Sequence, residues 1–353
     1  MGGPDLFAVH FNARVRAMRS ELFPRARIED ILDQQDLAVT IEFLLNSPYQ
    51  KEMAEALAEH QGADAVEEAV TRNLSKNFRK LMYRGKGRYR ELTLRFLLRW
   101  DLTAVKSLLR ARHCGLHGQE AMPALVPGPT LSVALLRNLA TAESMEALVS
   151  GLMSWNAGLC GCLIKAVEQY RAEHSMAIIE EALDRRYFVT NSRELKDAPD
   201  EDSRLLRCLL QMEIDRINLR VLFKLMDAKV SRQSMESYLL PEGSLSQRVL
   251  SRMIASQSVV EVMELLGNTI YRELVEQLYH FLQTRRFAPL ERYFELTLMQ
   301  QLRRMARNKP FSIAVPMDYT WQKSNEVTNL RLIARGEARH LARGRVREEL
   351  LYV

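Results

Sequence analysis

One short pattern occurs three times in this sequence of 353 residues, and it constrains the fold more than any other feature. The pattern is an acidic residue, an aliphatic residue four positions later, and basic residues five and nine positions later. The three acids are Asp101, Asp215 and Glu326, so successive copies lie 114 (215 − 101) and 111 (326 − 215) residues apart. This spacing is much longer than the few tens of residues of common solenoid repeats. We therefore predict three copies of a small domain.

Other segments recur at nearly the same spacing. The segment 66–69 recurs at 179–182 and more faintly at 290–293, and the turn 127–132 recurs at 241–246. A further segment, 44–49, is echoed at 265–271. We predict that the three repeat units cover residues 1–125, 126–239 and 240–353.

A polar position accompanies two of the three acids. Asn218 and Asn329 each follow the acid by three residues, whereas the first copy has Ala104 at that position. We predict that these asparagines and the three acids have equivalent structural roles. Salt bridges or helix caps explain recurring acids better than catalysis, because equivalent residues of separate units do not meet at one bond.

The composition predicts helices throughout. Glycine (15) and proline (11) are scarce and fall at breaks, and no segment alternates β-branched residues with period two. The sequence therefore predicts an all-α fold with no sheet, and Asp36 is expected to cap a helix that begins at Leu37. The longest predicted helices cover residues 66–82, 91–112, 163–187, 203–227, 289–307 and 321–339.

Charge and hydropathy exclude several classes of protein. No run of 18 apolar residues is present, so we predict no membrane span, and the first residues do not resemble a secretory signal. Four irregularly spaced cysteines indicate a reducing cytoplasm. The net charge of +6 is consistent with nucleic-acid binding, but the bases alternate with glutamates as on solvated helix faces. A protein near an anionic membrane surface would show the same mild basicity.

The sequence contains no pattern typical of a catalytic or metal site. Phosphate-loop, nucleophile-elbow and zinc-protease patterns are missing, and neither His113, Cys114 and His117 nor the pair Cys160 and Cys162 has the usual zinc spacing. The basic segment 84–90 (RGKGRYR) is better explained as a solvated turn than as an anion site. We predict a protein that is not an enzyme and needs no cofactor or metal.

Three segments resemble a known family. The end of the chain (326–336, followed by 347–350), its opening (11–18) and its centre (213–224) resemble a V/A-type ATPase component, known as the C subunit in prokaryotes and the d subunit in eukaryotes. His340 departs from the family, which commonly has a small residue there. The resemblance implies an all-helical funnel of three units around a pseudo-threefold axis.

The same resemblance implies a function. The family's members are the non-catalytic socket of the rotor, which connects the central axle to the membrane ring of proteolipid subunits and transmits torque for proton or sodium transport. Such a protein would be peripheral, on the cytoplasmic face of the membrane. We hypothesise that basic residues near the end of the chain contact these partners, although a solvated face also explains them: Arg335, Arg339, Arg343, Arg345 and Arg347.

Two other classes of protein remain as alternatives. A helical-repeat adaptor unrelated to ATPases would stack its units linearly and present an apolar groove to peptides. A nucleic-acid-binding helical protein would show one continuous basic stripe and a strong dependence of binding on salt.

Overall fold

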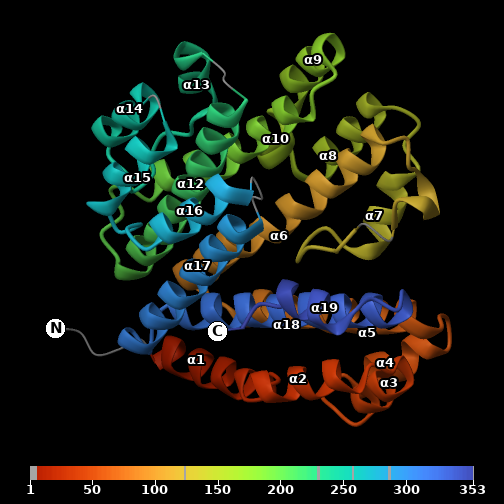
Figure 1. Cartoon of the computed structure of the whole chain (residues 1–353). Coiled ribbons are helices and arrows are strands. Elements are labelled where there is room, and N and C mark those ends of the chain that lie inside the picture. Colours follow the sequence, from red (N-terminus) through yellow and green to blue (C-terminus); the bar gives the residue numbers. More distant parts are fainter. Residues whose placement is uncertain (1–5, 123–124, 229–230, 257, 285–287, 353) are drawn as a thin grey trace. The chain divides into compact units, whose positions relative to one another are not determined.

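The computed structural model describes residues 6–122, 125–228, 231–256, 258–284 and 288–352. Throughout these ranges the regular structure is helical and no strand occurs, which confirms the all-α prediction (Figure 1). The chain divides into two compact parts. We call residues 1–143 with 302–353 the terminal body and residues 144–301 the middle body. The repeat units proposed from the sequence follow a different division and stay a prediction.

The terminal body combines helices from both ends of the chain. Its helices are α1 (Leu6–Arg19), α2 (Arg25–Gln34), α3 (Leu37–Leu45), α4 (Gln50–Leu57), α5 (Gly62–Arg84), α6 (Gly87–His113), the 3-10 turn η1 (Gly118–Glu120), α7 (Val133–Ala140), α18 (Ala314–Ala338) and α19 (Arg343–Glu349).

The middle body is built from one continuous stretch of chain. It contains α8 (Met145–Cys160), α9 (Leu163–Glu173), α10 (Met176–Asp184), the π-helical turn η3 (Arg185–Val189), α11 (Thr190–Glu194), α12 (Glu201–Asp227), α13 (Arg232–Tyr238), α14 (Gln247–Ala255), α15 (Val259–Gly267), α16 (Leu274–Thr284) and most of α17 (Ala288–Asn308). One apolar core joins α12 to the helices α14–α17, with Phe223 and Phe281 fully buried in it.

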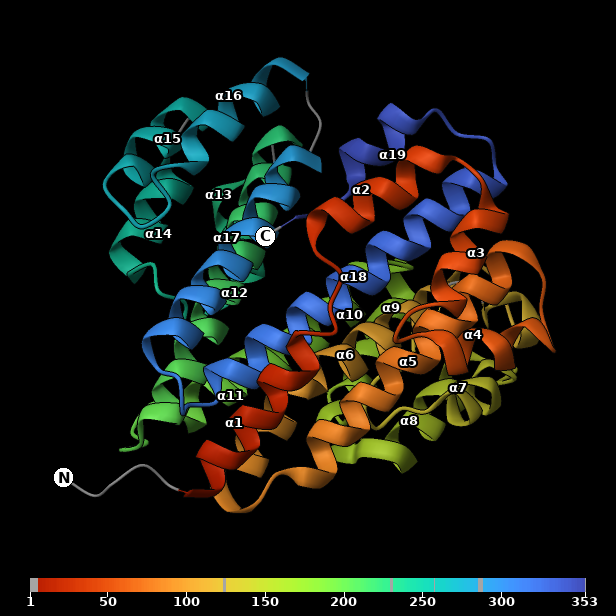
Figure 2. The same ribbon diagram turned by 90° about the horizontal axis from the view of Figure 1, so that it is seen from below.

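Helix α18 is the centre of the terminal body. It lies along α5 and α1, and α2, α3, α6 and α19 also contact it (Figure 2). Its first eight residues, 314–321, are all buried, so the helix has no polar face at this end. The sequence predicted a break at 308–316, but α18 already begins at Ala314. Pro316 lies in the first turn, where the N–H that proline lacks would have no partner within the helix.

Local signals account for some helix ends but not for others. The Asp36 side chain accepts a hydrogen bond from the Ala38 N–H at 2.8 Å, which confirms the predicted cap. The predicted helix over 163–187 is wrong, because it is broken between α9 and α10. His174 ends α9 in the left-handed region, with φ of 50°. The apolar pattern continues through this residue and gives no sign of the break.

No single helix in the described ranges is both long enough and apolar enough to cross a membrane. The pair α8 and α9 reaches the required length and composition together, but is bent by 118°.

The contact of α18 with α19 gives a stability prediction. A Cβ added at Gly336 would lie 2.6 Å from Val346 Cγ2, on a buried valine of α19. Overpacking of this kind costs about 1–3 kcal/mol, against a gain of about 1 kcal/mol from the better helix propensity of alanine. We expect Gly336→Ala to lower the free energy of unfolding, measured in urea, and Val346→Ala in the same chain to restore part of the loss. Additive effects of the two substitutions would contradict this packing.

Candidate functional site

A buried acid of α12 connects three segments of the middle body. Asp215 is fully buried, and its carboxylate accepts hydrogen bonds from the backbone N–H groups of Ser244 at 3.1 Å and Leu245 at 3.2 Å. The hydroxyl of Ser244 also donates to it, as does that of Tyr271 at 2.8 Å. Ser246, which directly follows Leu245, is the N-cap of α14. The acid thus fixes the approach to α14 and the tyrosine that precedes α16.

The terminal body contains the same arrangement at the first recurring acid. Asp101 of α6 is fully buried and accepts hydrogen bonds from the N–H groups of Thr130 at 3.1 Å and Leu131 at 2.8 Å, and from the Thr130 hydroxyl at 2.8 Å. The next residue, Ser132, is the N-cap of α7. We call this arrangement an acidic joint: a buried acid on a long helix that binds the chain just before a following helix.

Close approach of the backbone to the acid requires glycine in both joints. A Cβ at Gly128 would overlap the Asp101 carboxylate, and one at Gly243 would overlap that of Asp215. Any larger residue would displace the turn that supplies the N–H donors. The recurring turns 127–132 and 241–246 are therefore the chain segments that these acids hold.

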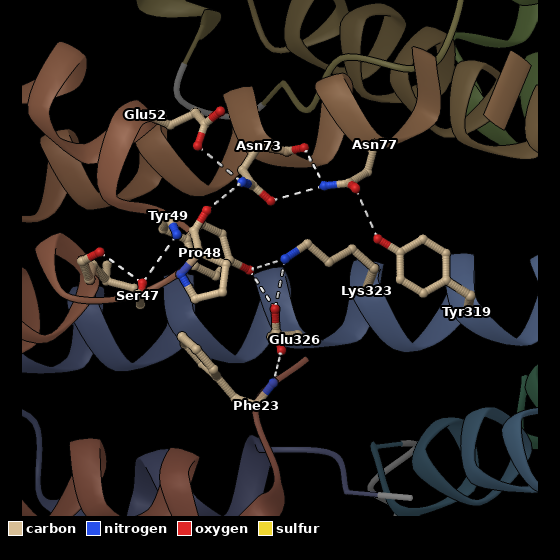
Figure 3. A network of polar contacts seen from close by, with 11 residues as sticks. Phe23, Ser47, Pro48, Tyr49, Glu52, Asn73, Asn77, Tyr319, Lys323 and Glu326 are labelled. Carbon is tan, nitrogen blue, oxygen red and sulfur yellow. Dashed lines mark hydrogen bonds and ion pairs between the residues drawn. The ribbon is translucent and has the colours of Figure 1, made fainter. Parts of the chain in front are cut away.

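The third acid completes its joint with residues from the start of the chain. Glu326 of α18 accepts hydrogen bonds from the Phe23 N–H, from the Tyr49 hydroxyl at 2.6 Å and from Lys323 Nζ at 2.8 Å (Figure 3). Phe23 lies just before α2, whose N-cap is Pro24. The joint thus fixes the approach to α2, as the other two joints fix those to α14 and α7.

The tyrosines of the second and third joints occupy equivalent positions. Tyr271 follows Leu245 by 26 residues, and Tyr49 follows Phe23 by the same number (271 − 245 and 49 − 23). Each tyrosine N–H donates at 3.1 Å to a hydroxyl two residues earlier, which itself donates to a leucine carbonyl. The corresponding position after Leu131 is Ala157, whose side chain has no polar atom.

Two asparagines form a second set of equivalent contacts. Asn218 donates to the carbonyl of Leu240 at 2.8 Å and accepts from its N–H at 2.7 Å. Asn329 makes the same reciprocal pair with Leu351, at 2.8 and 3.1 Å. Both partners lie 22 residues after their asparagine. Alanine cannot form these bonds, so Ala104 leaves the first copy without this contact.

The third joint includes a buried ion pair. Lys323 and Glu326 have side chains that are each 5% exposed, and Lys323 also donates to the Tyr49 hydroxyl at 2.8 Å (Figure 3). A buried pair is tolerated only when its remaining hydrogen-bonding groups are satisfied, and here Tyr49 and Phe23 satisfy them. Burial, and next the charge of Glu326, raises the pKa of Tyr49 well above its usual value.

A chain of polar side chains continues from this joint along α5 (Figure 3). Tyr319 donates to Asn77 at 2.9 Å, Asn77 donates to Asn73 at 3.0 Å, and Asn73 donates to Glu52 at 3.1 Å. Glu52 is also paired with Lys76 at 2.6 Å. These contacts connect α18, α5 and α4 through side chains whose partners are all within the terminal body.

Three of the five arginines predicted to contact partners form ion pairs inside the terminal body. Arg335 pairs with both carboxylate oxygens of Glu67, and Arg331 also pairs with this glutamate, at 3.0 Å. Arg343 and Arg347 pair with Asp33 at 3.0 and 2.7 Å. Arg347 also pairs with Glu29 at 2.9 Å. These arginines connect α18 and α19 to α5 and α2.

The other two arginines, Arg339 and Arg345, are exposed and form no ion pair with any residue that the structure describes. In this set they are the arginines whose charge is not paired within the described residues.

The three joints hold chain segments against long helices through hydrogen bonds. Each carboxylate is occupied by donors from the chain itself, and the three acids are separated in different joints. Within the described ranges, no group of three or more histidine, cysteine or acidic side chains is placed to hold a metal ion. The sequence identified the acids and asparagines, and the recurring segments 44–49 and 265–271 end at Tyr49 and Tyr271. It did not pair these tyrosines with the acids, and it did not identify Phe23 or Lys323.

Loss of the reciprocal asparagine contact gives a stability prediction. We expect Asn218→Ala to lower the free energy of unfolding by about 2–3 kcal/mol, because it leaves the buried N–H and C=O of Leu240 without partners. Asn329→Ala is expected to cost less, because the Leu351 carbonyl also accepts a hydrogen bond from Asn325 at 2.9 Å. The exposed Asn138, replaced by alanine, is the control and should change stability by less than about 0.5 kcal/mol. Equal effects at Asn218 and Asn138 in urea unfolding would contradict the role of the contact.

The first joint gives a prediction for the dependence on pH. Burial raises the pKa of Asp101 from 3.8 to about 6, although the hydrogen bonds from Leu131 and Thr130 lower it. Because the folded pKa is above the unfolded one, the contribution of Asp101 to stability is fully present below about pH 4 and is lost as the pH rises through about 6.

Asp101→Asn removes this titration. The free energy of unfolding of the wild type should therefore rise relative to that of the variant between pH 6 and pH 4, by up to about 2–3 kcal/mol. Urea unfolding across this pH range measures the difference. Replacement of the exposed Asp30 by asparagine is the matched control. A difference that is constant with pH for Asp101→Asn would refute the prediction.

Comparison with known proteins agrees with the resemblance seen in the sequence. The model of the ATP synthase (C/AC39) subunit family matches residues 11–349. The A-type ATP synthase C subunit of Methanococcoides burtonii is 28% identical over 345 residues, which cover 97% of this chain and 93% of that protein. The corresponding protein of Methanothermobacter thermautotrophicus is 26% identical over 336 residues (94% and 85%), and that of Methanosarcina acetivorans 25% over 340 residues (96% and 91%). The chain belongs to the ATP synthase (C/AC39) subunit family.

Proposed function

We propose that this chain is the non-catalytic rotor subunit that connects the central axle of an A/V-type ATP synthase to its membrane ring of proteolipid subunits. It transmits torque between the two and binds no nucleic acid. It is peripheral, on the cytoplasmic face of the membrane, and does not span it. Membership of the subunit family over nearly the whole chain is the main support. The same membership removes the alternative of an adaptor unrelated to ATPases.

The acidic joints support this role physically. A coupling protein must resist deformation, and close-packed helices held by satisfied buried polar contacts do so. In each joint, a backbone N–H from the segment that precedes one helix donates to an acid on a long helix and so holds that segment in place. Torque applied to one helix is thereby passed to the next without large rearrangement.

The third joint supports a closed arrangement of three modules. Its acid lies near the end of the chain, and its partners Phe23 and Tyr49 lie near the start, at the spacing seen within the second joint. A linear array would leave the last acid without partners. We propose that the repeat units 1–125, 126–239 and 240–353 close around a pseudo-threefold axis as a funnel that receives the axle.

The assembly itself provides the test. The full chain, tagged and expressed with the axle and proteolipid subunits, should co-purify with both. Arg339→Glu with Arg345→Glu should reduce recovery of a partner at low salt, because these exposed arginines supply polar contacts that salt screens. The control is Arg14→Glu with Arg248→Glu, two exposed bases outside the C-terminal region.

The outcomes separate two claims. A wild-type chain that brings down neither axle nor ring would overturn the proposed function. Recovery that is unchanged by the Arg339 and Arg345 substitutions would refute only their part in the interface.

A further inference from the structure

Three of the exposed large apolar side chains of the terminal body lie on segments that are far apart in the sequence but are brought together by the fold. Leu6 at the start of α1 is 74% exposed, Tyr83 at the end of α5 is 77% exposed, and Phe311 just before α18 is 45% exposed. Single exposed apolar residues are ordinary. A group of them is informative when the fold brings them to one surface and when charged residues surround them.

Contacts around Tyr89 bring these segments together. The ring of Phe7 lies 6.1 Å from that of Tyr89, and the Tyr89 hydroxyl donates to Asn12 at 2.6 Å. Asn12 in turn donates to the carbonyl of Ser312 at 3.1 Å. Leu6 is next to Phe7 and Phe311 is next to Ser312, while Tyr83 lies six residues before Tyr89. Figure 2 shows the turn between α5 and α6 beside the start of α1.

The turn between α5 and α6 adds positive charge to this surface. The segment 84–90 contains four bases and no acid. Arg88 pairs with Glu91 at 2.8 Å, and Arg90 donates to the Met82 carbonyl. Arg84 and Lys86 are exposed, and neither forms an ion pair with another residue in the described parts of the chain.

Two glycines define the backbone of the turn that carries Arg84 and Lys86. A Cβ at Gly85 would lie 2.9 Å from the Cβ of Arg90, and Gly87 has a φ of 50° in the left-handed region. Both glycines are therefore required for a tight turn, which presents Arg84 and Lys86 next to Tyr83.

We propose that this surface, Leu6, Tyr83, Arg84, Lys86 and Phe311, binds the surface of a membrane that contains anionic lipids. Basic residues next to a membrane are attracted to anionic headgroups, and leucine and aromatic side chains insert shallowly between them. An acidic protein would match the two cations, but it would not require apolar side chains on three separate segments around them. The partner is lipid, so the inference goes beyond the proposed contacts with axle and ring.

Vesicle binding by the purified full-length chain tests the proposal without other subunits. We expect sedimentation with vesicles of phosphatidylcholine mixed with phosphatidylglycerol, weakened by salt, and little with phosphatidylcholine alone. Arg84→Glu with Lys86→Glu should lower the partition coefficient by about 30-fold or more. Arg339→Glu with Arg345→Glu makes the same change of charge elsewhere on the terminal body and should leave it nearly unchanged.

A second variant tests the apolar part. Serine at positions 6, 83 and 311 together should lower binding several-fold at the same charge. In a separate variant, Tyr83→Trp, the tryptophan fluorescence should shift to the blue when anionic vesicles are added, and by more than in the wild type. Thermal unfolding of each variant verifies that the fold is retained.

Three results would overturn the proposal: equal binding to neutral and anionic vesicles, equal loss in the Arg84/Lys86 and Arg339/Arg345 variants, or no vesicle binding at all. If the chain failed to bind vesicles but still co-purified with axle and ring, the lipid contact would be refuted and the proposed function retained.

Discussion

The fold depends on a buried carboxylate that accepts hydrogen bonds from the chain just before a following helix. Burial of a carboxylate is costly unless several donors compensate for the lost water. Asp215 receives two N–H and two hydroxyl groups, and the recurring turn beside it contains the glycine that permits this approach. The acid and the turn are therefore one structural unit, although about thirty residues separate them.

The three joints are not equally stabilised. The second and third have a tyrosine on the acid and an asparagine that binds a backbone segment 22 residues later. The first has neither, since Ala104 and Ala157 occupy these positions. Local opening is easiest where polar contacts are fewest. Of the three joints, the first, at the start of α7, therefore has the fewest stabilising contacts. The third differs from the others in its ion pair between Lys323 and Glu326.

The sequence predicted what depends on local chemistry and on recurrence. The cap at Asp36 follows from residue types and their spacing, and so do the long helices predicted over 91–112 and 203–227, which the structure shows as α6 and α12. The break at His174 did not follow, because a single residue in the left-handed region leaves the apolar pattern intact. The early start of α18 was missed because its first eight residues are all buried and show no alternation of exposed and buried positions, and because Pro316 was interpreted as part of a break.

Long-range partners could not be predicted for a different reason. Glu67 and the two arginines that share it lie more than 260 residues apart, and no local pattern indicates that they meet. The same holds for Glu326 and Phe23. Only the circular continuation of the repeat, in which the start of the chain supplies what the end lacks, would have suggested this contact.

That continuation couples the two ends of the chain energetically. Without α18, Tyr49, Asn77 and Glu67 would lose partners that no other element supplies in the described structure. Without α1–α4, Lys323 and Glu326 would remain as a charge pair stripped of Tyr49 and Phe23, and loss of such partners from buried charges costs several kcal/mol. Each end thus supplies partners for buried groups of the other, and we expect the terminal body to fold only when contacts across nearly the whole chain form together. Mutual dependence of this kind opposes local deformation, as the proposed transmission of torque would require.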